Sequence, residues 1–241
     1  MSALSGRTRF WLLTAAALGA VWITLSLGWW QMSRAAEKAA LQAMIDGRRS
    51  LAALEPRSLA GAARGADILY RTVHLRGSWL AGNTVFLENR QMYGKAGFFV
   101  LTPLQLENSA TAVLVQRGWV QRSFIDRAQV PAVPTPVGPA EITGRIAPSP
   151  AKLYEFGDSG GGVIRQNLDL DRYSREIGVP LAEFLVLQLG PTTEGLARDW
   201  PAVNTGIDKH YGYAVQWFAL CGLIVILYGW FQIVRRFISP R

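Results

Sequence analysis

Two long apolar stretches lie near the ends of the sequence and enclose a more polar middle region. The first runs from Phe10 to about Trp30 and the second from Tyr211 to about Phe231. A helix rises about 1.5 Å per residue, so each stretch of roughly 21 residues can cross a hydrocarbon layer about 30 Å thick. The pattern predicts two transmembrane helices, at residues 10–30 and 210–231, around one extramembrane domain at residues 31–209.

The middle region begins as a helix and then changes to short strands. Good helix formers continue to about Ile45, where Asp46 and Gly47 indicate a stop. Runs rich in β-branched and aromatic residues follow at 70–76, 84–87, 97–101, 112–116, 140–146, 163–165 and 184–189. A short helix capped by Asp169 is expected at 169–177. Because the strands are closely spaced and joined by polar turns, we expect an antiparallel β-rich domain, a small barrel or sandwich of the α+β class.

One of these strands lies in a proline-rich stretch. Six prolines occur between residues 130 and 150, on both sides of the strand expected at 140–146. Proline lacks the N–H that a sheet interior requires. This segment is therefore expected to be an edge strand or a surface excursion.

The charges at the two ends predict the orientation in the membrane. Arg7 and Arg9 precede the first apolar stretch, and Arg235, Arg236 and Arg241 follow the second, while neither tail contains a carboxylate. Short tails rich in Lys and Arg stay in the cytoplasm. We expect tails 1–9 and 232–241 inside and the domain in the periplasm of a bacterium, across its inner membrane.

A cleaved signal peptide is the alternative for the first stretch. Its apolar run is longer than the usual 7–15 residues of a signal peptide, and the Gly28-Trp29-Trp30-Gln31 sequence is typical of a membrane interface instead. We therefore expect an uncleaved anchor.

The composition argues against two classes of function, nucleic-acid binding and catalysis. The net charge of +8 and the pI of 10.1 are caused largely by the tails, so nucleic acid is not an expected partner. The chain has two histidines and one cysteine, without a nucleophile elbow, a paired-carboxylate motif or a thiol couple. We do not expect an enzyme.

Polar and aromatic residues gather at the outer ends of both predicted spans. Trp30 and Gln31 lie at the end of the first; His210, Gln216 and Trp217 lie at the start of the second. Because both ends reach the same membrane face, an imidazole, two amides and several indoles can surround a flat apolar cofactor such as haem, with His210 as a ligand of the iron. Ordinary interfacial anchoring is the alternative.

Several segments of the chain, in their order along the sequence, resemble the surfeit-locus (Surf/Shy) family of cytochrome c oxidase assembly factors. The first span matches at Leu27–Arg34, within a pattern Gly-x-Trp-Gln-x-x-Arg, and the second at His210-x-x-Tyr-Ala-x-Gln-Trp-Phe. The matching domain pieces are Arg76–Trp79, Asn89–Arg90, Gly97–Phe98, Leu101–Leu104 and Val113–Val120. Gln121 departs from the proline that the family often has there, and residues from about 130 to 180 match only faintly.

The resemblance implies a role in assembling haem-copper cytochrome c oxidase. The implied activity is to bind haem a and assist its insertion into the large oxidase subunit, with haem a synthase as a further partner. His210 would then be the haem ligand, with Gln31, Gln216 and Trp217 around it. Arg90 and Arg117 would contact haem propionates or a partner, or form structural ion pairs. Two alternatives stay open: a haem-independent scaffold for an oxidase assembly intermediate, and an anchored sensor unrelated to respiration.

Overall fold

The computed structural model describes residues 6–55, 67–123, 130–148, 162–200, 206–234 and 238. The chain divides into a helical unit, residues 1–44 and 202–241, and a β-rich unit, residues 45–201. Arg7 and Arg9 lie in the first turn of a helix, whereas the basic residues of the second predicted tail lie outside the described residues.

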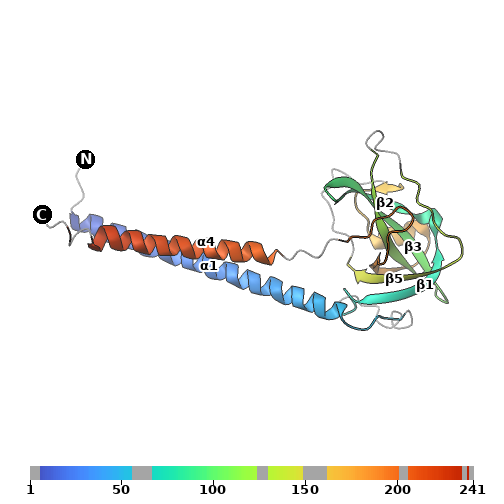
Figure 1. Cartoon of the computed structure of the whole chain (residues 1–241), viewed down its shortest axis with the longest axis horizontal. Coiled ribbons are helices and arrows are strands. Elements are labelled where there is room, and N and C mark those ends of the chain that lie inside the picture. Colours follow the sequence, from blue (N-terminus) through green and yellow to red (C-terminus); the bar gives the residue numbers. More distant parts are fainter. Residues whose placement is uncertain are drawn as a thin grey trace. The chain divides into compact units, whose positions relative to one another are not determined.

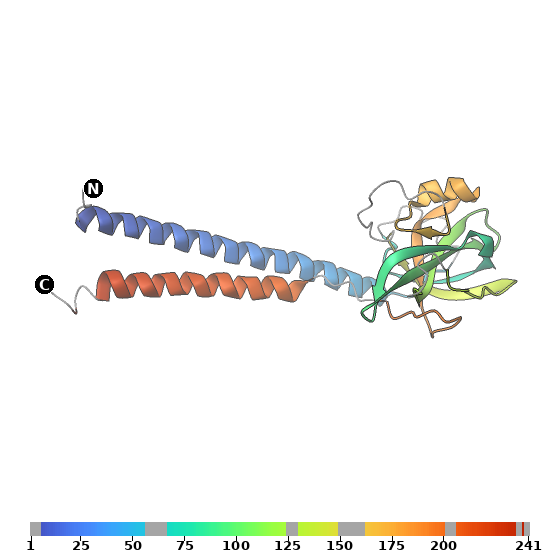
Figure 2. The ribbon, with the colours of Figure 1, turned by 90° about the horizontal axis from the view of Figure 1, so that it is seen from above.

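The helical unit contains two long apolar helices that run side by side (Figures 1 and 2). Helix α1 (Gly6–Arg49) is 44 residues long, and α4 (Ile207–Tyr228) continues into the π-helical segment η2 (Gly229–Val234). Both are long and apolar enough to cross a membrane. Helix α1 passes the predicted stop at Asp46 and ends only at Arg49, because a single glycine in a helix costs only about 1 kcal/mol.

Each helix presents one narrow stripe of less exposed residues to the other. The stripe of α1 consists of Thr14, Ala17, Val21, Thr24, Gly28, Gln31 and Ala35. The stripe of α4 consists of His210, Ala214, Trp217, Cys221, Ile224 and Tyr228. Both follow alternating steps of three and four residues, the repeat of helices that pack along a shared seam. Small residues in α1 allow the close approach that apolar helices use in membranes.

The β-rich unit is a seven-stranded mixed sheet that closes into a barrel. Its strands are β1 (Thr72–Trp79), β2 (Val85–Met92), β3 (Lys95–Leu106), β4 (Ala112–Gln121), β5 (Pro139–Ala147), β6 (Ile164–Arg165) and β7 (Leu181–Gln188). The order is β1-β5-β7-β4-β3-β2-β6, and an additional pairing of β1 with β3 completes a five-stranded ring. The strands β2 and β6 extend the sheet beyond that ring.

Two strand predictions need correction. The sheet is not wholly antiparallel, because β7 pairs parallel to β4 and β6 pairs parallel to β2. The strand predicted at 140–146 is not at an edge either: β5 pairs with β1 on one side and with β7 on the other. The prolines permit this because Pro139 is its first residue and Pro148 follows its end, so no proline interrupts the interior of the ladder.

The barrel is filled by apolar side chains of its own strands. Val73, Leu75, Val115, Ile146 and Val186 are all at most 1% exposed and belong to one cluster. A second cluster lies between the sheet and the short helix α3 (Leu170–Ile177), whose Tyr173 is buried. As predicted, Asp169 caps this helix by accepting a hydrogen bond from the Arg172 backbone N–H.

Gly77 lies where β1 pairs with both β3 and β5, and we expect its replacement by alanine to destabilise the barrel. A Cβ atom at Gly77 would lie 2.1 Å from the backbone oxygen of Gln105, so the strands must separate, at a cost of about 1–3 kcal/mol. The matched control is Gly82→Ala, because no atom lies within 4 Å of that added Cβ. Thermal unfolding followed by near-ultraviolet circular dichroism compares the two variants, and equal melting temperatures would contradict the prediction.

Candidate functional site

A hydrogen bond joins the two predicted site residues that lie on opposite helices. His210 Nδ1 lies 2.7 Å from Gln31 Oε1. Gln31 is buried and His210 is half-buried. The structure thus places Gln31, well inside α1, next to His210 in the first turn of α4.

The contact orients the imidazole and selects its tautomer. The amide oxygen of Gln31 accepts, so His210 Nδ1–H donates. A neutral imidazole protonated at Nδ1 carries its free lone pair on Nε2, the nitrogen then able to bind a metal. A second group that accepts from one ring nitrogen is the usual companion of a metal-binding histidine, because it fixes the ring orientation and raises the basicity of the other nitrogen.

Three further contacts between the two helices hold this pair in register. Near the opposite end, Thr14 Oγ1 and Tyr228 Oη lie 2.7 Å apart. Between the two polar contacts, the ring of Phe218 packs on Gly28, where an added Cβ would lie 2.5 Å from a ring carbon. Trp29 meets the same ring edge to face, with 6.2 Å between the centroids. The position of His210 opposite Gln31 thus depends on the whole helix pair.

The other predicted site residues are placed differently. Trp217 lies seven residues after His210 on the same seam and is half-buried. Trp30 is 52% exposed and Gln216 is exposed, so neither is packed into the seam. The structure brings Gln31, His210 and Trp217 to one face of the pair and leaves Trp30 and Gln216 outside it.

Sequence reasoning did not identify the seam that positions these residues. Thr14 and Tyr228 were missed altogether, while Gly28 and Phe218 were named only within the interfacial sequence and the family motif, not as packing contacts. The signal was present as a 3.5-residue repeat of small and hydroxyl-bearing residues in an apolar helix, a pattern that indicates helix pairing.

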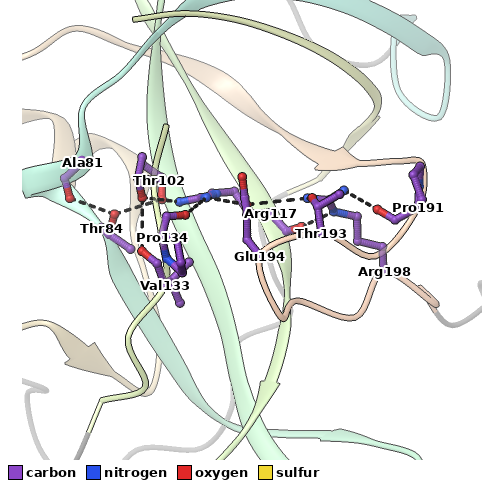
Figure 3. A network of polar contacts seen from close by, with 11 residues as sticks. Ala81, Thr84, Thr102, Arg117, Val133, Pro134, Pro191, Thr193, Glu194 and Arg198 are labelled. Carbon is purple, nitrogen blue, oxygen red and sulfur yellow. Dashed lines mark hydrogen bonds and ion pairs between the residues drawn. The ribbon is translucent and has the colours of Figure 1, made fainter. Parts of the chain in front are cut away.

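In the barrel, Arg117 forms the centre of a buried polar network (Figure 3). Val100 pairs with Gly118 and Leu101 pairs with Gln116, so Arg117 is the extra residue of a β-bulge in β4. A bulge redirects a side chain, and here the guanidinium lies 5.0 Å from the centroid of the Trp79 ring. It is fully buried.

The hydrogen bonds of Arg117 connect two loops to the barrel. It donates to Thr135 Oγ1 at 2.7 Å and to the Pro134 backbone oxygen at 2.8 Å, and so holds the proline-rich segment. It also donates to Glu194 Oε2 at 2.5 Å. The second arginine, Arg198, donates to the Arg117 backbone oxygen and lies 3.9 Å from the same Glu194 oxygen.

Arg90 is also buried within the barrel unit. It donates to the Gln166 backbone oxygen at 3.0 Å, and its guanidinium lies 5.8 Å from the centroid of Phe99. Burial lowers the pKa values of Arg90 and Arg198 from their ordinary range, with Glu194 opposing that effect at Arg198. Of the roles weighed for Arg90 and Arg117, the structural one agrees with this burial.

Comparison with known proteins agrees with these features. The SURF1 family model matches residues 18–222, which include Gln31, His210 and the whole barrel. The chain is 25% identical over 227 residues to a SURF1-like protein of Rickettsia conorii, covering 90% of this chain and 89% of the relative. It is 28% identical over 236 residues to a SURF1-like protein of Drosophila melanogaster, covering 88% and 75% respectively. The chain belongs to the SURF1 family, known in general as cytochrome oxidase assembly factors.

Proposed function

We propose that this protein binds haem a at the Gln31–His210 contact and assists its insertion into the large subunit of cytochrome c oxidase. The single observation that carries the proposal is the 2.7 Å contact between Gln31 Oε1 and His210 Nδ1. A single imidazole supplies one ligand, which suits an iron ion that already has four porphyrin nitrogens. Family membership supports the oxidase as the destination.

The residues around the contact fit such a group. His210 would hold the iron through Nε2, and Gln31 would keep the ring in the required tautomer. The indole of Trp217, on the same seam, would supply flat apolar surface for a macrocycle. Trp30 lies on the same turn of α1 as Gln31, but its exposed indole lies outside the seam. When bound, the haem is cargo, and the task of these residues is to hold and release it.

The proposed setting is the inner membrane of a bacterium, with both termini in the cytoplasm and the barrel in the periplasm. It is supported by the two apolar helices and by tails that carry basic residues without carboxylates. The Gln31–His210 contact would then lie toward the periplasmic face. The large oxidase subunit, haem a synthase and membrane lipid are the proposed partners.

The test is His210→Ala in the full chain, purified in detergent after co-expression with haem a synthesis. We expect the Soret band of the bound haem to disappear and assembled oxidase to decrease. The chain offers a matched control in its other histidine: His74 lies exposed on β1, with Nδ1 3.0 Å from Thr143 Oγ1, and His74→Ala should retain the band. Full haem occupancy in His210→Ala would contradict the proposal.

A haem-independent scaffold is the second candidate, and the placement of Gln216 favours it. This amide is exposed on an otherwise apolar stretch of α4. An amide inside a membrane needs a hydrogen-bond partner, which a helix of another protein can supply. If this function is the correct one, His210→Ala will assemble oxidase normally, while Gln216→Leu will reduce assembly.

A further inference from the structure

One cation lies on the turn of α1 that follows Gln31. Arg34 lies three residues after Gln31, about 4.5 Å further along the helix axis. Side chains of a helix lean toward its N-terminus. In agreement, Arg34 Cζ lies 5.8 Å from the centroid of the Trp30 ring, so the guanidinium stays close to the turn that contains Gln31.

The carboxylate that Arg34 binds within the chain is easily exchanged. Arg34 Nη1 donates to Glu37 Oε2 at 2.8 Å, and the two side chains are 49% and 58% exposed. An exposed ion pair of this kind contributes little to the stability of a protein. A second carboxylate that arrives already oriented can therefore replace Glu37 at little cost.

The charges next to the site favour an anionic group. The described charged residues nearest in sequence to Gln31 and His210 are Arg34, Glu37, Lys38, Asp208 and Lys209. Three are cations and two are carboxylates, so the site has a positive surplus. The planar guanidinium, supported by an indole face, is the one donor among them that can bind a carboxylate through two parallel hydrogen bonds.

We propose that Arg34 binds a propionate of the haem held by His210, and that this propionate replaces Glu37. The inference rests on the proposed function. It assigns to Arg34 the carboxylate contacts that the sequence resemblance offered to Arg90 and Arg117, both of which are buried in the barrel unit. No covalent bond changes: one carboxylate leaves the guanidinium and another takes its place.

The test separates the propionate contact from every other part of binding. Ferric protoporphyrin IX and its dimethyl ester, which lacks the carboxylate charges, are titrated into the detergent-purified full chain, and Kd is obtained from the Soret shift. For Arg34→Gln we expect about a ten-fold weaker Kd for the free acid and an unchanged Kd for the ester, since only the acid loses a hydrogen bond between two charged groups. Arg34→Lys should recover part of the loss, because it retains the charge without the fork.

The matched control is Arg76→Gln on β1, which also removes an exposed ion pair, Arg76 Nε to Glu141 Oε1 at 3.0 Å. It should leave both Kd values unchanged. Equal weakening of acid and ester in Arg34→Gln, or no weakening of either, would overturn the role of Arg34 and leave the proposed function standing. Loss of the Soret shift for both probes in the unaltered chain would overturn the proposed function as well.

Discussion

Arg117→Ala is expected to destabilise the barrel by roughly 3 kcal/mol, the lower end of the range for breaking a buried ion pair, because Arg117 is fully buried whereas Glu194 is 21% exposed. Glu194 would then keep the ion pair with Arg198, which lies 3.9 Å from its Oε2. Thr135 Oγ1 and the Pro134 backbone oxygen would lose their donor. A loss of this size is a large share of the 5–15 kcal/mol that stabilises a typical domain, so a lower melting temperature and a poor yield of folded protein are the expected result.

Two further variants separate the causes of that loss. Arg76→Ala removes an arginine from an exposed ion pair whose side chains are 66% and 71% exposed, and should change stability by less than about 1 kcal/mol. Combining Arg117→Met with Glu194→Gln removes both charges of the pair and should restore part of the stability. If Arg117→Ala melts at the temperature of the unaltered chain, the network in Figure 3 does not stabilise the barrel.

Gly28→Leu is expected to abolish haem binding without changing any proposed ligand. Even a Cβ atom at this position would lie 2.5, 2.7 and 2.8 Å from three carbons of the Phe218 ring. A whole leucine side chain must displace the Phe218 ring or push α4 away from α1, and we expect the Gln31–His210 hydrogen bond to break when the helices separate. Gly19→Leu is the control, since nothing lies within 4 Å of a Cβ there and the position is exposed.

Spectroscopy of the helix pair measures the separation of α1 and α4 directly. Spin labels replace two exposed residues, Leu18 on α1 and Ile226 on α4, in a Cys221→Ser background, and pulsed electron paramagnetic resonance reports their separation. Gly28→Leu should broaden or shift the distance distribution and remove the Soret band. If Gly28→Leu keeps the distance distribution and the Soret band of the unaltered chain, and its near-ultraviolet circular dichroism is also unchanged, then the helix contact does not position His210.

The elements with strong local signals were predicted well from the sequence. Long apolar stretches and good helix formers indicate α1 and α4, and the Asp169 cap marks the start of α3. Hairpin neighbours such as β2, β3 and β4 are antiparallel, as expected. The parallel pairing of β4 with β7 joins residues about 70 apart in sequence, and no turn residue or periodicity encodes such a contact.

The candidate site was predicted only in part, because the sequence does not encode which residues of two distant segments meet. Two apolar spans must place Gln31 and His210 at the same membrane face, so topology alone brings the two regions together. Helical phase then decides which residues meet, and a single apolar stretch does not reveal which face meets the partner helix. This is why Gln216 was grouped with His210 although it lies outside the seam. Arg117 was equally ambiguous, because a β-bulge that turns a side chain inward leaves little trace in sequence.

The strand order has a consequence for the growing chain. Strand β7 lies between β5 and β4, so the ring is open until residue 188 has been synthesised. Until then β4 and β5 each have an edge that lacks its β7 neighbour, and open edges invite pairing with other chains. Only 18 residues separate the end of β7 from the start of α4. Ring closure and emergence of the second apolar helix therefore fall close together in time, which leaves a short interval in which a nearly complete barrel is vulnerable to aggregation.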